Sequence, residues 1–174
     1  MRKNENFDVV LAKDCARAFT TSTGLGTVVS LADGEPLATY GTYHCENCRI
    51  CQLAGKQHTL CIQSHIYGMN EAERFGGKYV YFCPLGLTCF TSPIVGTDST
   101  DAKITVGPFL MMGRQDYIHD DLLPRAQMPY DLQELTAEVQ KIPVVPAARV
   151  EDISSLLFMA VGFMNNVWAA SNML

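Results

Sequence analysis

The chain has 174 residues, of which 48% are hydrophobic and 18% are charged, and its formal net charge is −5. A chain of this length buries an adequate core as one domain without disulfide bonds. The negative charge and the lack of a cluster of Lys and Arg argue against a nucleic-acid-binding surface. Residues 1–6 are charged and no apolar signal segment follows them, so we expect a cytoplasmic protein with reduced cysteines.

The first third of the chain predicts a helix followed by a hairpin. Apolar residues at helical spacing predict the helix over Phe7–Phe19. Asp33-Gly34 is a strong hairpin turn and joins two predicted strands, Thr27–Leu31 and Pro36–Tyr40. The cysteine-rich segment that follows, Gly41–Lys56, is expected to be irregular.

A second helix and three further strands are predicted next. The helix covers Thr59–Phe75 and ends at a glycine pair. The three strands are predicted over Lys78–Phe82, Leu87–Val95 and Ala102–Met112, and two more helices near Asp121–Arg125 and Asp131–Lys141. This order predicts an α+β fold: a PAS-like five-stranded antiparallel sheet flanked by helices, with a further helix at the C-terminal end.

The last segment carries apolar residues at alternating spacings of three and four, which is the heptad period of a coiled coil. The seam is formed by Val150, Ile153, Leu157, Ala160, Met164, Val167, Ser171 and Leu174. We expect a parallel homodimer through Ile153, Leu157, Ala160, Met164 and Val167, and the alternative is a helix that packs on its own domain. The expected organisation is a domain over residues 1–142, then a linker and dimerisation helix over 143–174. Polar residues interrupt the helix, so it does not predict a membrane span.

Six of the seven cysteines lie between residues 45 and 89, spaced Cys45-x2-Cys48-x2-Cys51-x9-Cys61 and Cys83-x5-Cys89. Thiolates are soft ligands that suit zinc or an iron–sulfur cluster, and this spacing favours neither. The candidate metal ligands are Cys45, Cys48, Cys51, Cys61 and Cys83, and His65 lies one helical turn from Cys61. The alternatives are redox-active thiols or small buried hydrophobic residues.

Enzyme motifs are weak in this sequence. His44-Cys45-Glu46 matches the H-x-E of zinc deaminases, but the P-C-x-x-C partner is absent. The sequence contains no phosphate loop, no G-x-S-x-G and no dinucleotide fingerprint. We therefore expect no catalytic turnover, with a metal-dependent enzyme as the least favoured hypothesis.

Several separate motifs together resemble the PocR sensory domain family, over most of residues 7–125. They are Phe19-x4-Gly24, Val28–Gly34, Cys48-x12-Cys61-x21-Cys83-Pro84-x-Gly86-Leu87, Ser92-Pro93-Ile94 and Gly107-Pro108-Phe109-Leu110. Cys48, Cys61 and Cys83 fall on the three cysteine positions of the family, so we expect their sulfurs to lie within mutual coordination reach. This sequence adds Cys45, Cys51 and Cys89, which raises the chance of a metal or cluster.

The resemblance implies a variant PAS-like domain that senses a small molecule, such as propanediol or another small hydrocarbon derivative. Domains of this family lie upstream of DNA-binding modules, histidine kinases or cyclic-dinucleotide enzymes, so a linked output domain is expected. The ligand pocket would lie between the sheet and the middle helix, lined by Tyr81, Phe82, Phe90 and Met111. The main alternative is a redox, zinc or iron–sulfur sensor whose cysteines are themselves the receptor.

Overall fold

A computed structural model describes residues 7–96 and 100–172, and the side chains up to residue 166. Its centre is a five-stranded antiparallel sheet in the order β2-β1-β5-β4-β3. The strands are β1 (Thr27–Leu31), β2 (Pro36–Tyr40), β3 (Tyr79–Phe82), β4 (Thr88–Val95) and β5 (Thr100–Phe109). The sheet and its flanking helices confirm the predicted fold class.

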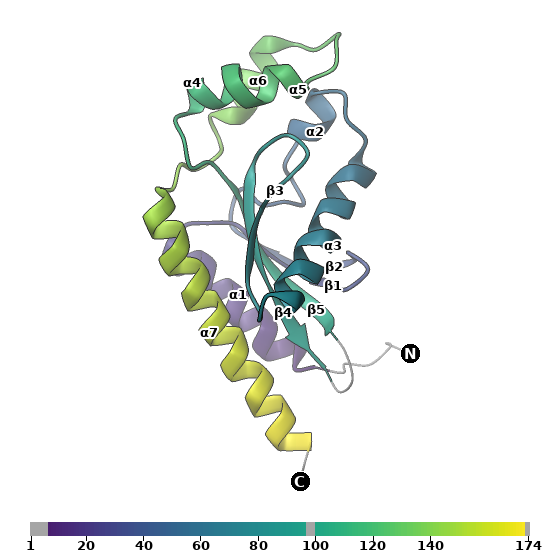
Figure 1. Ribbon diagram of the computed structural model, residues 1–174, viewed down its shortest axis with the longest axis vertical. Helices are drawn as coiled ribbons and strands as arrows, with labels where there is room; N and C mark the ends of the chain where they lie inside the picture. Colours follow the sequence, from purple (N-terminus) through teal and green to yellow (C-terminus); the bar gives the residue numbers. More distant parts are fainter. Residues whose placement is uncertain (1–6, 97–99, 173–174) are drawn as a thin grey trace.

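The helices surround this sheet (Figure 1). They are α1 (Val9–Thr23), α2 (Ile50–Leu53), α3 (His58–Arg74), α4 (Arg114–Asp116), the π-helical turn η1 (Tyr117–Leu122), α5 (Leu123–Arg125), α6 (Leu132–Val139) and α7 (Ala147–Asn172). Asp8 caps α1, because its carboxylate accepts a hydrogen bond from the Leu11 N–H at 2.9 Å. The short α2 lies inside the segment that was expected to be irregular, and it is anchored by the buried side chain of Ile50.

The two faces of the sheet are covered by different helices (Figure 1). Helices α1 and α7 cover one face and bury the larger apolar core, whereas α3 lies against the other face. The core residues that the strands contribute to the first face are Val29, Phe90, Ile94, Ala102, Ile104 and Val106. Because side chains alternate along a strand, Val28, Ser30, Lys103 and Thr105 point to the other face, where they line a cavity with residues of α3.

Helix α7 packs on its own domain along much of the predicted seam. Leu157 is 0% exposed and Met164 is 3% exposed, and both belong to the core under the sheet, together with Val150, Ile153 and Val161. Ala160 is exposed, and the side chain of Val167 lies outside the described residues. Leu157 and Met164 therefore contact their own sheet, contrary to the expectation that they face a symmetry mate. Within the described residues, no helix is long and apolar enough to cross a membrane.

A smaller core holds α2 and the segment from α4 to α6 at one end of the sheet. Tyr117 is buried there, and its hydroxyl donates a hydrogen bond to the Leu85 carbonyl at 2.9 Å. The chain then returns to the sheet, where the Leu110 N–H donates to the Pro143 carbonyl at 2.9 Å and the Val145 N–H donates to the Leu110 carbonyl at 2.7 Å. The extended segment before α7 is thus tied to the end of β5.

Candidate functional site: a cysteine-lined cavity

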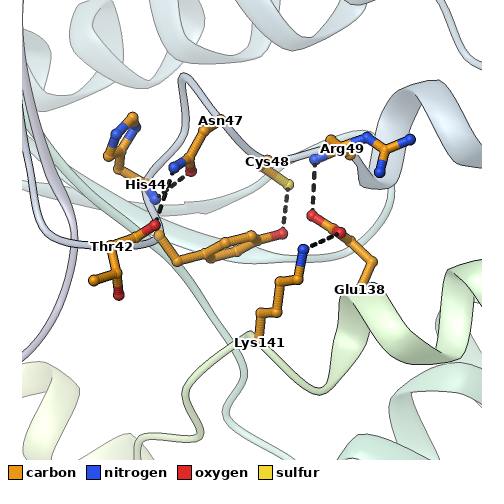
Figure 2. Close-up of polar contacts among 8 residues, drawn as sticks. Thr42, His44, Asn47, Cys48, Arg49, Glu138 and Lys141 are labelled. Carbon is orange, nitrogen blue, oxygen red and sulfur yellow. Dashed lines mark hydrogen bonds and ion pairs between the residues drawn. The ribbon is translucent and has the colours of Figure 1, made fainter.

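The loop that carries the first cysteines is fixed against the sheet by close backbone packing. A Cβ at Gly26 would overlap the carbonyl oxygen of Tyr43, so only glycine lets the loop approach β1 this closely. Inside the loop, the His44 N–H donates to Asn47 Oδ1 at 2.8 Å, and Asn47 Nδ2 donates to the Thr42 carbonyl at 3.0 Å (Figure 2). These bonds position the cysteines on either side of the turn.

All six cysteines between residues 45 and 89 line one cavity. They come from five places in the chain: the loop, α2, α3, the end of β3 and the start of β4. The other residues of the wall are Ile50, His58, His65, Leu87 and Pro108. The structure therefore brings together the five cysteines named as candidate ligands and adds Cys89. Whether these thiols bind a metal stays a prediction.

Three potential ligand atoms are already grouped at one side of this cavity. In the part of the chain that the structure describes, Cys45, His65 and Cys89 place one ligand atom each within 4.8 Å of one another. The sulfurs of Cys45 and Cys89 are 3.7 Å apart. Cys48, Cys61 and Cys83 line the same cavity, but these three described residues do not form such a group.

His65 is oriented by a tyrosine from the neighbouring strand. Its Nδ1 lies 2.5 Å from the hydroxyl oxygen of Tyr81, which leaves Nε2 as the other ring nitrogen that can bind a ligand. Tyr81 pairs with Cys89 across β3 and β4, so both side chains are on the α3 side of the sheet. A Cβ at Gly68 would lie 2.5 Å from the Tyr81 ring, so glycine on α3 makes room for the ring.

Burial keeps most of these thiols protonated in the metal-free protein. It raises the pKa of Cys48 to about 12 and that of Cys83 to about 12. Hydrogen bonding between the Cys51 and Cys61 thiols lowers the pKa of Cys51 and raises the pKa of Cys61. A thiophilic metal ion would displace these protons, because the thiolate is the form that binds metal.

Polar contacts link the cysteine loop, the start of α2 and α6 (Figure 2). The Tyr43 hydroxyl donates to the Cys48 sulfur at 3.2 Å. Glu138, which is only 3% exposed, accepts hydrogen bonds from the Arg49 N–H at 3.3 Å and from Lys141 Nζ at 3.1 Å. Helix α6 therefore holds the start of α2 in place, and the Tyr43 hydroxyl lowers the pKa of Cys48 below what burial alone would give.

The four residues that were expected to line a ligand pocket do not lie around one common pocket. Tyr81 is buried against α3 and contacts His65. The Phe90 ring packs on Phe19 and Phe109, on the α1 side of the sheet, and Met111 packs against the same core. Phe82 is 60% exposed. Of the four, Tyr81 is the one that reaches the site, because strand alternation turns Phe90 to the opposite face.

The five candidate ligands predicted from the sequence left out Cys89, whose role as ligand or buried thiol stayed open, and His65, which was noted only as a residue that could complete a site. A signal for His65 was its position one turn after Cys61 on a predicted helix. For Cys89 the signal was its place in the cysteine cluster, and its pairing with Tyr81 across β3 and β4 puts it on the α3 face.

One family model matches most of the chain. The model described as "Sensory domain found in PocR" matches residues 5–167. No curated protein matches the sequence significantly.

Solved structures resemble the chain only weakly. One is the targeted domain, residues 129–302, of a transcriptional regulator of the IclR family, with 10% identity and a TM-score of 0.39 over 90% of this chain and 95% of that one. Another is a transcriptional regulator from Rhodococcus sp. RHA1, with 16% identity and a TM-score of 0.35 over 76% and 67% of the two chains. A third is the inducer-binding domain of the PobR transcription factor from Acinetobacter, a double mutant in complex with 3-hydroxybenzoic acid, with 15% identity and a TM-score of 0.34 over 75% and 96%. These scores are too low to support an argument about function.

Proposed function

Because the chain belongs to the PocR sensory domain family, we propose that it is a cytoplasmic sensor whose receptor site is the cysteine-lined cavity, and that α7 relays the signal to a linked output domain. The observation that carries the proposal is the convergence of six cysteines and two histidines, from five separate places in the chain, on one cavity. A structural role alone does not require so many thiols at one place. The site suits a small hydrocarbon-derived molecule, a thiophilic metal ion, or both.

A metal-bound or redox-active form of the sensor is the second candidate. The grouping of Cys45, His65 and Cys89 supports it, since two thiolates and an imidazole suit zinc, and a thiolate-rich wall also suits an iron–sulfur cluster. Three protein ligands would leave a fourth position for a small molecule. No nucleophile–base pair in a recognised frame supports catalysis, so we propose that the domain binds without turnover.

Elemental analysis of protein purified without oxygen tests this proposal. We expect about one zinc or one iron–sulfur cluster per chain, and a brown colour identifies the cluster. The double variant Cys45→Ser/Cys89→Ser should lose the metal. Cys15→Ser is the control, because Cys15 lies on α1 against the other face of the sheet. Protein without metal, whose stability does not respond to added zinc, would contradict the metal-bound form and leave the small-molecule sensor.

The proposed relay uses β4, which contacts α3 on one face and α7 on the other. A change at the cavity can therefore reach α7 through a single strand. Zinc is a usable probe: its addition should change hydrogen exchange in α3 and also in α7. If exchange changes around the cavity and remains constant throughout α7, the relay is wrong.

Dimerisation, if α7 carries it, must use a face other than the buried seam. Leu156, Met159 and Phe163 are exposed on α7 at spacings of three and four. We propose that a second copy of the chain pairs along this stripe. Phe163→Glu should then shift the protein toward the monomer in sedimentation, whereas Val10→Glu, at an exposed apolar position on α1, should not. A wild type that is monomeric at micromolar concentration would remove the dimer from the proposal.

A further inference from the structure

A lysine is buried on β5, the central strand of the sheet. Lys103 is 2% exposed, and among the described residues its Nζ has no hydrogen-bond partner. Lysine is almost never fully buried unless it is paired, because removing an ammonium from water without compensation is unfavourable. The described part of the chain therefore leaves the ammonium available to pair with another group.

The direction of this side chain follows from strand alternation. Ala102 and Ile104, on either side of it along β5, belong to the core under α1 and α7. Lys103 and Thr105 consequently face α3 and line a second cavity between α3 and the sheet. The enclosed space of this cavity is about 20 Å³, which is room for roughly one water-sized group, and the cavity opens to solvent at its mouth. The polar group of a short ligand could occupy the enclosed space beside Lys103, while its carbon chain extends into the open mouth.

The charges around the lysine leave its ammonium available to a ligand. The acidic groups that influence it are Asp33 and Glu46, both exposed, and neither forms an ion pair with it among the described residues. The imidazole rings of His58 and His65 also line the cavity. The cavity floor thus offers one cation together with hydroxyl groups.

The remaining wall combines hydroxyl-bearing and apolar residues. Ser30 and Thr105 lie near Lys103 on the sheet side, and Val28 and Ile62 supply apolar surface. One cation, two hydroxyls and an apolar wall match a carboxylate on a short carbon chain. A phosphate, which carries more charge, usually recruits several cationic or backbone N–H donors.

We propose that this cavity binds a short-chain carboxylate whose anionic group pairs with the Lys103 ammonium and accepts hydrogen bonds from Ser30 and Thr105. The proposal rests on the sensory role above and names the ligand class for that role. It also places the carboxylate next to the thiols, since Cys45, His58, Cys61 and His65 line both cavities.

Isothermal titration with a matched pair of ligands tests the proposal. Lactate and propane-1,2-diol share a carbon skeleton and differ in the carboxylate. We expect the whole chain to bind lactate at least about tenfold more tightly than the diol, as a charged hydrogen bond predicts. Lys103→Met should reduce lactate affinity at least about tenfold and should reduce diol affinity by a smaller factor, because the diol lacks the charge that pairs with the ammonium. Lys78→Met is the control, because Lys78 is a surface residue paired with Glu151 and Ser155.

The outcomes separate this inference from the sensory role itself. If the diol binds and lactate does not, the sensory role is supported and the carboxylate site is overturned. If no carboxylate from formate to butyrate binds, the carboxylate site is also overturned. Equal lactate binding by wild type and Lys103→Met overturns the role of Lys103. A chain that responds to neither the carboxylates, the diol nor zinc would count against the sensory role as well.

Discussion

The two faces of the sheet differ in chemistry although they are built by the same strands. On the α1 and α7 face, the strands present aliphatic and phenylalanine side chains that pack tightly against helices. On the α3 face, the same strands present thiol, hydroxyl, phenol and ammonium groups around two cavities. The first face supplies stability and the second supplies binding chemistry, so a substitution should affect one property according to the face it touches.

The largest expected effect comes from truncating the buried side of α7. Leu157→Ala should lower the free energy of unfolding by about 2–5 kcal/mol, because it leaves a cavity in the main core. Leu132 on α6 is 50% exposed and lies outside the proposed dimer stripe, so Leu132→Ala should change stability by less than about 0.5 kcal/mol. Urea denaturation of both variants measures the difference. Equal stabilities would mean that α7 does not pack on the sheet in solution.

A histidine on the α3 face should make the free energy of unfolding decrease at acidic pH. Burial, with smaller effects of Lys103 and His58, lowers the pKa of His65 to about 4, whereas an unfolded histidine titrates near about 6.5. The unfolded chain therefore binds the proton first, and stability is lost as pH falls from about 6.5 to about 4, by up to about 1.4 kcal/mol per pH unit.

Unfolding free energies between pH 7 and pH 4 measure this contribution. His65→Gln should remove that part of the slope, whereas His119→Gln, at an exposed position in η1, should keep the slope of the wild type. If His65→Gln leaves the slope unchanged, the histidine is protonated as easily in the folded protein as in the unfolded chain.

The same substitution, glycine to alanine, can be made in the helix on each face of the sheet, at Gly68 on α3 and at Gly162 on α7. Gly68→Ala would push a methyl group into the Tyr81 ring and should destabilise the protein by about 1–3 kcal/mol. Gly162→Ala on α7 meets nothing within 4 Å, so it should stabilise the protein by about 0.5–1 kcal/mol through helix propensity. Thermal melts report both signs. If Gly68→Ala instead stabilises the protein, α3 does not pack closely on the Tyr81 ring.

The smallest effect concerns the outer wall of the cysteine cavity. Tyr43→Phe removes the hydroxyl that donates to Cys48, so stability should fall by about 1 kcal/mol and the pKa of Cys48 should rise further. Mass spectrometry should then find slower alkylation of Cys48 in metal-free protein. Tyr67→Phe, at an exposed position on α3, is the control and should alkylate at the wild-type rate.

The order of helices and strands was readable from the sequence because its periodicity and turn residues are strong. Strand β1 begins and ends where it was predicted, and α3 differs by one residue at each end. The direction of α7 packing was not readable, because a 3.5-residue period and a 3.6-residue period differ by only about 20° per heptad. Three heptads are too few to separate a dimer seam from a face that packs inward.

The site was only partly readable for a different reason. The clustering of cysteines in the sequence predicted a common location, and the structure places six of them around one cavity. Lys103 could not be identified, because the alternation Ala102-Lys103-Ile104-Thr105-Val106 is also typical of a strand with one face in water. Only the position of α3 turns that polar face into a buried one.

The adjacency of Cys89 and Phe90 on β4 has a consequence for how relatives of this domain diverge. Cys89 lines the cavity and Phe90 packs in the main core. Neighbouring positions of one strand are therefore selected for different properties, ligand binding at one and core packing at the next. We expect positions such as 89, 103 and 105 to change when a relative adopts a new ligand. Positions 90, 104 and 106 should meanwhile keep their side-chain volume. Ligand specificity can then be exchanged between relatives by substituting alternate residues, while the scaffold stays the same.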